Sequence, residues 1–136
     1  MLNKKYITFL KVYGPAILWG MFILIATLTP GKSLPSSSLF RFDKFIHVVI
    51  FGVFAWLVLR AYFLSSKNNN SKTNVYLVVG VSTILFGIAI EGMQQFIPDR
   101  GADRYDIIAN TVGIIAAQIL FYFVHRRETS HEINNR

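Results

Sequence analysis

The chain has 136 residues, of which 53% are hydrophobic and only 15% are charged. Lysine and arginine outnumber aspartate and glutamate by 14 to 7, and cysteine is absent. This composition is too apolar for an ordinary soluble domain, and the lack of cysteine excludes disulfide scaffolds, thiol nucleophiles and Cys-ligated zinc. The apolar residues form long blocks. Such blocks indicate a membrane protein and exclude a disordered tail, a coiled coil or a nucleic-acid-binding arm.

A membrane-spanning helix needs about 20 mostly apolar residues. Four segments meet this requirement, at about 7–28, 45–64, 75–97 and 107–124. Short polar stretches at 29–44, 65–74 and 98–106 are predicted to be the loops between them. We therefore predict an all-α fold, a compact bundle of four transmembrane helices in one domain over residues 1–136, with a polar, frayed tail at 125–136.

The orientation follows from the positive residues on each side of the membrane. The side that carries both termini collects nine of them: Lys4, Lys5, Lys11, Arg60, Lys67, Lys72, Arg126, Arg127 and Arg136. The other side has five: Lys32, Arg41, Lys44, Arg100 and Arg104. Because Lys and Arg are enriched on the cytoplasmic side, both termini are predicted to be cytoplasmic.

Unusual polar side chains gather at the outer ends of the last three spans. Three pairs are separated by four residues: Asp43 with His47, Glu91 with Gln95, and Asp106 with Asn110. Residues at this spacing project from one helical face, so three such faces at one depth predict one polar pocket. Lys44 and Arg100 flank it. Arg100 is the candidate for a bidentate anion contact, because a guanidinium matches phosphate or carboxylate geometry.

Structural roles compete with binding at several of these positions. Asp43 and Asp106 can cap a helix N-terminus, where a carboxylate also suits the positive end of the helix dipole. His47 can be an interfacial histidine held by Asp43, although the same contact would also prepare a base or ligand. Lys44 can be an interfacial anchor. Capping and binding are compatible, so both roles stay open.

Glu91 is the hardest of these residues to explain by structure alone. An acid inside a span costs on the order of 2.5 kcal/mol or more at the bilayer centre, so Glu91 is expected to face the bundle interior. Its expected partner is Arg100, His47 or Asn110, and a purely structural ion pair is the alternative. Small residues line the facing stripes of two spans: Gly80 and Gly87 in the third, and Ala109, Gly113 and Ala117 in the fourth. We therefore expect these two helices to pack closely.

Standard catalytic signatures are missing from the sequence. It contains no HExxH, no GxSxG, no P-loop and no glycine-rich dinucleotide fingerprint. A metal held by His47, Glu91 and Asp106 is geometrically conceivable, but His125 and His131 are predicted to lie across the membrane from it. We expect neither a metal nor a cofactor. The carboxyl groups at the outer face permit acid–base chemistry, but nothing selects a reaction, so enzyme activity stays undecided.

Two ordered motifs resemble those of VanZ-like membrane proteins. The segment Asp43-Lys44-Phe45-Ile46-His47 resembles a D-K-x-x-H opening of a span. The stretches Glu91-x-x-x-Gln95, Pro98-x-Arg100 and Asp106-x-x-x-Asn110-x-x-Gly113 resemble the family's E-x-x-x-Q, P-G-R, D-x-x-x-N and G signature. The chain departs from the pattern at Asp99, where glycine is usual, and at Ala117, where a second glycine is common.

The resemblance implies a multi-pass protein of the bacterial cytoplasmic membrane. It marks eight ligand-binding candidates by position: Asp43, Lys44, His47, Glu91, Gln95, Arg100, Asp106 and Asn110. The namesake of the family is associated with resistance to the glycopeptide teicoplanin, which makes a role in the cell envelope the expectation here. Expected partners are membrane lipids and a lipid-linked envelope precursor, with no nucleic acid.

Three functions remain open at this point. The leading one is engagement of an anionic lipid headgroup or a lipid-linked envelope precursor by the outward polar pocket. The second is an intramembrane hydrolase or transferase with His47 or Glu91 as the base. The third is a small transporter or accessory subunit, which would require an oligomer because four short helices enclose little volume.

Overall fold

The computed structural model describes residues 4–30, 43–65 and 72–134. Its helices are α1 (Lys4–Leu28), α2 (Asp43–Ser65), α3 (Lys72–Gln94) and α4 (Arg104–Asn134). All four are long and apolar enough to cross a membrane, which confirms the predicted all-α architecture of four candidate spans. Most of the first two predicted loops, at 31–42 and 66–71, lies outside the described residues.

Two helix ends differ from the prediction. α3 ends at Gln94, three residues early, and continues as tight turns in which the Ile97 N–H donates to the Gln94 carbonyl. The cause is Pro98, which disfavours helical geometry at the residue before it. α4 continues as a helix to Asn134, beyond the predicted end of the last span at 124 and into the segment predicted to be a polar, frayed tail. This segment contains no glycine or proline that would end a helix.

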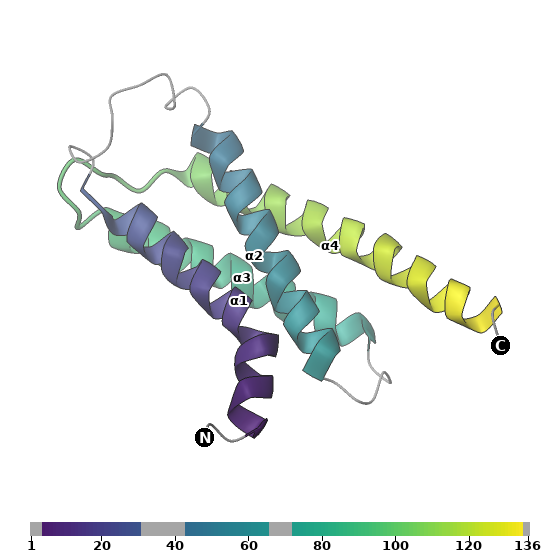
Figure 1. Ribbon diagram of the computed structural model, residues 1–136. Helices are drawn as coiled ribbons and strands as arrows, with labels where there is room; N and C mark the ends of the chain where they lie inside the picture. Colours follow the sequence, from purple (N-terminus) through teal and green to yellow (C-terminus); the bar gives the residue numbers. More distant parts are fainter. Residues whose placement is uncertain (1–3, 31–42, 66–71, 135–136) are drawn as a thin grey trace.

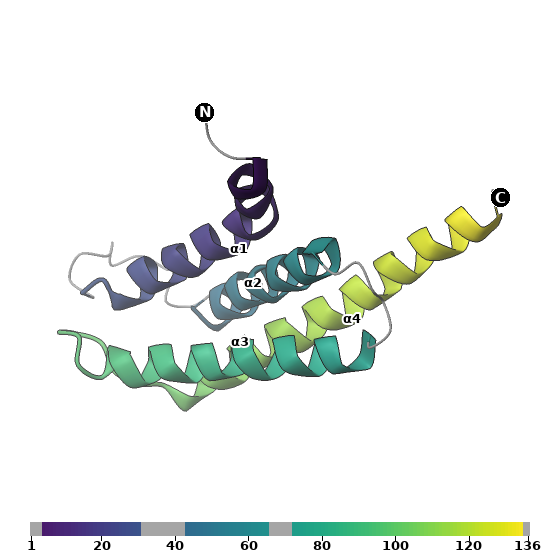
Figure 2. The same ribbon diagram turned by 90° about the horizontal axis from the view of Figure 1, so that it is seen from below.

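α2 is the central helix of the bundle. Within the described residues it contacts each of the other three helices, whereas α1 and α4 do not touch each other. Figure 2 shows α2 between them. Because the chain threads back and forth, the starts of α2 and α4 and the end of α3 lie at one end of the bundle, and both termini lie away from it (Figure 1).

The interior has two apolar clusters. One contains Ile23, Phe51, Ala55, Ile90 and Ile114, and the other contains Leu59, Val75, Val79 and Phe121. In lipid, apolar burial between helices gives little net driving force, so close van der Waals packing holds the helices together.

The closest approach in the bundle is between α2 and α4. A Cβ placed on Gly113 would meet the backbone carbonyl oxygen of Val48 and lie 3.0 Å from its Cα. The small-residue stripe of α4 was expected to face α3, but Gly113 faces α2. Gly80 of α3 does face α4, against Gln118, whereas Gly87 faces both Asn110 of α4 and Phe51 of α2. Glycine at position 113 therefore sets the α2–α4 spacing on which the polar end of the bundle depends.

Large apolar side chains cover the outside of the bundle. Leu18 is 69% exposed, Leu77 66% and Leu120 58%, with many others on all four helices. A soluble monomer does not present so much contiguous apolar surface to water. These side chains are the surface that hydrocarbon would cover.

Candidate functional site

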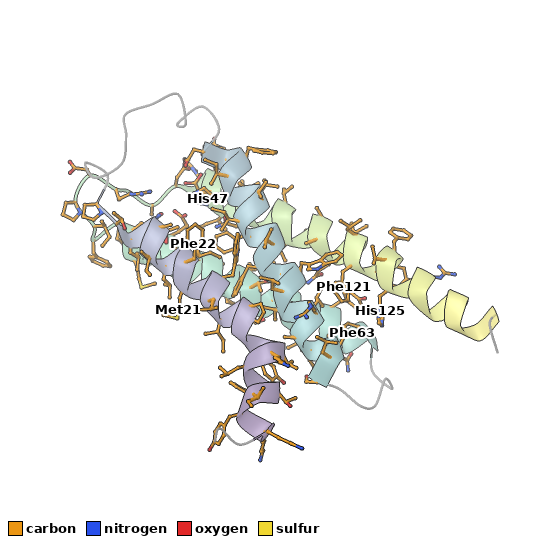
Figure 3. All side chains as sticks on the ribbon, in the orientation of Figure 1. Met21, Phe22, His47, Phe63, Phe121 and His125 are labelled. Atoms are coloured by element: carbon orange, nitrogen blue, oxygen red, sulfur yellow. The ribbon has the colours of Figure 1, made fainter. Side chains whose placement is uncertain are left out.

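A polar cluster occupies the end of the bundle where α2 and α4 begin. We use this name for seven residues: Asp43, Lys44 and His47 of α2, Glu91 of α3, and Asp103, Asp106 and Asn110 at the start of α4. Four of them, His47, Glu91, Asp106 and Asn110, are each less than 10% exposed. Figure 3 shows His47 in the first turns of α2, at the end of the bundle remote from His125. Three helices therefore bring polar groups to one depth, as expected from the spacing of the residues.

His47 is held from one side by an amide. Its Nδ1 lies 3.0 Å from Asn110 Oδ1. An amide oxygen only accepts hydrogen bonds, so Nδ1 carries the proton in this contact. The other ring nitrogen, Nε2, lies 3.9 Å from Asp43 Oδ1 and 3.7 Å from Asp106 Oδ2. The imidazole is thus oriented by α4 and presents Nε2 to two carboxylates.

Lys44 joins the two acids at the start of α4. Its ammonium donates to Asp103 Oδ2 at 2.8 Å and to Asp106 Oδ1 at 2.9 Å. The first of these bonds lowers the pKa of the Asp103 carboxyl below its ordinary value, and a bond from the Tyr105 N–H lowers it further. The Lys44 ammonium also lies 5.6 Å from the centre of the Tyr105 ring. The lysine is more than an interfacial anchor, because it bridges α2 to α4.

The N-cap of α4 is Asp103. Its Oδ1 accepts the N–H of Tyr105 at 2.8 Å, which satisfies one of the free donors at the start of the helix. Asp106 had been a capping candidate, but its two oxygens face Lys44 and His47. With Asp103 in the capping role, the carboxylate of Asp106 serves the interior of the cluster.

Glu91 is buried, and only one of its two carboxyl oxygens accepts a hydrogen bond within the described part of the chain. Its Oε2 accepts the backbone N–H of Asp103 at 3.1 Å, so its hydrogen bond comes from the backbone rather than from the three side chains that the sequence favoured. Among the residues that the structure describes, Glu91 Oε1 has no hydrogen-bond partner, and neither does Asn110 Nδ2. Leaving a buried polar group unpaired costs about 1–3 kcal/mol. The cluster therefore offers one unused acceptor and one unused donor.

Two of the eight candidates do not join the polar cluster. Gln95 is exposed and donates to the carbonyl of Gly92, because α3 ends before it and the four-residue phase with Glu91 is lost. Gln94 is buried in its place and donates to the carbonyl of Thr27 at 3.0 Å.

Arg100 also serves the helix packing. Its Nε donates to the Thr29 carbonyl at 3.2 Å and its Nη2 to the Ala26 carbonyl at 3.4 Å. These carbonyls belong to the C-terminal end of α1, where a cation suits the helix dipole. Arg100 therefore ties the loop between α3 and α4 to α1.

A comparison with protein families shows which family the chain belongs to. The family model described as VanZ/LLP1 matches residues 6–125, nearly the whole chain. The chain belongs to the VanZ/LLP1 family. No curated protein and no solved structure matches it significantly. The resemblance seen in the two motifs is confirmed, and the chain is a multi-pass membrane protein of this family with four apolar helices.

The structure gives physical reasons for parts of the VanZ/LLP1 motifs. The D-K-x-x-H segment and the D-x-x-x-N segment meet through the Lys44–Asp106 and His47–Asn110 contacts. Asp99, which stands where the motif has glycine, has a φ of 60°. That left-handed conformation costs glycine nothing and is tolerated by aspartate better than by most residues. Asp99 can therefore adopt the left-handed turn that precedes Arg100.

Sequence reasoning missed the roles of three residues near the site. Asp103 is both the N-cap and a partner of Lys44, whereas the sequence pattern placed it only in the predicted loop at 98–106. Arg104 and Tyr105 are exposed beside it, with the guanidinium 5.9 Å from the ring centre. The signal for Asp103 was its position directly before a helical block, which is where N-caps occur.

Proposed function

We propose that this VanZ/LLP1 protein resides in the bacterial cytoplasmic membrane and binds the anionic headgroup of a lipid or lipid-linked envelope precursor at the polar cluster. The observation that carries the proposal is the gathering of buried polar groups from three helices at one end of the bundle. The ends of membrane-spanning helices are where lipid headgroups would lie. Buried polar groups are costly to insert into a membrane and are usually functional. The unused donor and acceptor of Asn110 and Glu91 support an external ligand.

The rim of the cluster provides the contacts for an anion. Lys44 has a side chain that is 52% exposed. Asp103 and Asp106 take two of its three N–H donors among the described residues, so one donor remains for a phosphate oxygen. Arg104 and Tyr105 are exposed next to it, and cations beside an aromatic ring are typical of the membrane interface. Arg100, the earlier candidate for this contact, is engaged with α1.

An apolar groove supports a ligand with a long hydrocarbon tail. The groove has a volume of about 500 Å³ and lies between α1, α2 and α3, with Gly20, Phe54 and Phe86 in its lining. Phe51 connects the groove to the polar cluster. The centre of its ring lies 6.5 Å from that of the His47 ring, to which it is nearly parallel, and 6.4 Å from that of the Phe86 ring. The groove extends away from the cluster as far as Tyr13 and Tyr62, so it would hold the tail of a lipid whose headgroup binds at the cluster.

Direct binding tests the proposal. We expect the purified full-length protein to bind phosphatidylglycerol or undecaprenyl phosphate in preference to phosphatidylcholine in native mass spectrometry. The double variant Lys44→Gln/Arg104→Gln should weaken this binding by at least about tenfold, which corresponds to the loss of one charge-assisted hydrogen bond. The matched control, Lys4→Gln/Lys11→Gln, removes two charges from the other end of the bundle. Equal binding by wild type and the Lys44/Arg104 variant would contradict the proposal.

The proposed orientation places both termini in the cytoplasm and the polar cluster outside. Its support is the excess of Lys and Arg on the side of the termini. Because the chain lacks cysteine, single cysteines report topology cleanly. A membrane-impermeant maleimide should label Asp99→Cys in intact cells, whereas Lys4→Cys should react only after permeabilisation. The reverse pattern would show the opposite orientation.

A link to glycopeptide resistance is an extension of the same proposal. It follows from the association of the family's namesake with teicoplanin, together with a site suited to an envelope precursor. We expect expression of the wild type to raise the teicoplanin tolerance of a susceptible Gram-positive host, and His47→Ala to abolish the effect at equal membrane abundance. Unchanged tolerance with the wild type would confine the function to lipid binding.

An intramembrane hydrolase or transferase is the second candidate. The observation that favours it is the orientation of His47, whose Nδ1 is held by Asn110 while Nε2 faces the cluster, as a general base requires. Turnover of undecaprenyl diphosphate by the wild type, lost in both His47→Ala and Glu91→Gln, would support catalysis. Binding without turnover of this substrate and of other lipid-linked phosphates would leave the protein a binding protein.

A further inference from the structure

Three potential metal ligands meet in the polar cluster. One oxygen each of Asp43 and Asp106 and the Nε2 of His47 all lie within 4.8 Å of one another. The side chains of His47 and Asp106 are 9% and 10% exposed, whereas that of Asp43 is 44% exposed. His47 and Asp106 are thus enclosed by the bundle, whereas the exposed Asp43 leaves the group accessible to an ion from outside the bundle.

The imidazole of His47 faces two carboxylates without a hydrogen bond to either. Its Nδ1 carries the proton that Asn110 Oδ1 accepts, so in the neutral ring Nε2 presents a lone pair to Asp43 and Asp106. The separations of 3.9 and 3.7 Å exceed the roughly 2.7–2.9 Å of a charge-assisted N–H···O bond. Zinc bonds to nitrogen and oxygen are about 2.0–2.2 Å long, so an ion between the three groups reaches all of them with small movements.

The surroundings of these ligands suit a cation. Asn110 binds the distal nitrogen of His47, which is the usual way in which a metal-ligating histidine is oriented. Lys44 engages Asp106 Oδ1 and leaves Oδ2 turned toward His47. The cluster holds four carboxyl groups beside two cations, Lys44 and the exposed Arg104 at its rim, so a divalent cation would suit its surplus of acidic groups.

We propose that Asp43, His47 and Asp106 bind a divalent transition-metal ion, with Zn²⁺ the best match to one nitrogen and two oxygen ligands. Three protein ligands leave a fourth tetrahedral position open, as in catalytic rather than structural zinc sites. An oxygen of a phosphate headgroup would fill that position. This last step rests on the proposed function, whereas metal binding itself does not. From the sequence, a ligand set of His47, Glu91 and Asp106 was conceivable but no metal was expected. In the structure Asp43, and not Glu91, lies with His47 and Asp106.

The first test is metal binding by the full-length protein in detergent, without any lipid substrate. Metal-stripped protein is titrated with Zn²⁺ in a calorimeter, and its metal content is measured after desalting. We expect one zinc per chain. His47→Gln and Asp106→Asn should each weaken binding by at least about tenfold, which is the lower end of the loss seen even for residues that only support a ligand.

Matched controls are available elsewhere in the chain. Asp99→Asn changes an exposed acid of the α3–α4 loop, and His125→Gln changes a histidine of α4 remote from the cluster. Both should bind zinc as the wild type does. Asp43→Asn alters the most exposed of the three ligands, so it keeps the test decisive if variants of the buried pair fail to fold. A wild type without stoichiometric zinc, or zinc binding that Asp43→Asn leaves unchanged, would overturn the metal site.

A second measurement separates the metal from the headgroup. Binding of undecaprenyl phosphate is compared with and without one equivalent of Zn²⁺. Tighter lipid binding with zinc supports the open coordination position. Zinc binding without any effect on the lipid would confirm the metal and overturn the phosphate step, and lipid binding without zinc binding would overturn the metal and leave the proposed function standing.

Discussion

Gly113 provides the most specific test of the packing that builds the site. In a Gly113→Ala variant the new Cβ would collide with the Val48 carbonyl oxygen and lie 2.8 Å from its carbonyl carbon. Real Cβ contacts stay beyond 3.0 Å, so α2 and α4 must separate by about 1 Å at this point. The neighbour is backbone and cannot rotate away. Overpacking of this kind costs about 1–3 kcal/mol, which we expect as the loss of folding free energy.

The same movement should damage the polar cluster. Val48 follows His47 directly, and Asn110 lies one helical turn before Gly113. Separating the helices by about 1 Å would stretch the 3.0 Å contact between His47 and Asn110 beyond hydrogen-bond range. The variant should therefore lose ligand binding as well as stability.

The assay is reversible unfolding in mixed micelles, compared with a glycine whose surroundings are empty. A Cβ at Gly14 of α1 would meet nothing within 4 Å. Gly14→Ala should be neutral or stabilising by up to about 1 kcal/mol, because alanine is the better helix former. Equal stabilities of the Gly113→Ala and Gly14→Ala proteins would refute the close approach of α2 and α4.

Three further predictions concern single contacts. The contacts with Lys44 and the Tyr105 N–H lower the pKa of Asp103 in the folded state, so the stability that this carboxylate supplies is present above its unfolded pKa of about 4 and is lost as the pH falls through the lower folded value. Asp103→Asn should flatten this acid-side loss of stability in unfolding measured from neutral to acidic pH. An unchanged profile would count against the ion pair. Asp99→Gly should leave the free energy of unfolding within about 0.5 kcal/mol of the wild type, whereas Asp99→Val should lower it by about 1–2 kcal/mol, since the φ of 60° disfavours a β-branched residue. Equal stabilities of the two variants would indicate that the turn is not left-handed. Trp19→Phe should cost about 0.5–1.5 kcal/mol, because the indole Nε1 donates to the Ile50 carbonyl at 3.0 Å and links α1 to α2; no loss in the unfolding assay would contradict that link.

Properties of single segments could be predicted from the sequence. Apolar block length gave the four helices, and four-residue spacing within α2 and α4 placed Asp43 with His47 and Asp106 with Asn110. The same rule failed for Gln95, because it holds only while the helix continues and α3 ends at Gln94. Because α3 ends three residues earlier than predicted, Gln94 is buried and Gln95 is exposed.

Contacts between segments were beyond such rules. Arg100 was predicted to be an anion ligand from its side-chain chemistry. Its hydrogen bonds to the carbonyls of Ala26 and Thr29, more than 70 residues earlier in the chain, could not be predicted from local spacing. Gly113 was assigned to the wrong neighbour because a small residue permits close approach without naming the helix that approaches. Both outcomes depend on how the four helices pack, and nothing in local spacing determines that.

The central claim is that α2 and α4 join through polar side chains at one end of the bundle. A double-mutant cycle with His47→Phe and Asn110→Ala, measured as free energy of unfolding in micelles, tests it most directly. The structure predicts a coupling energy of about 0.5–2 kcal/mol, the range found for contacting polar pairs. Additivity of the two single effects to within about 0.3 kcal/mol would show that the two side chains do not meet, and would contradict the site.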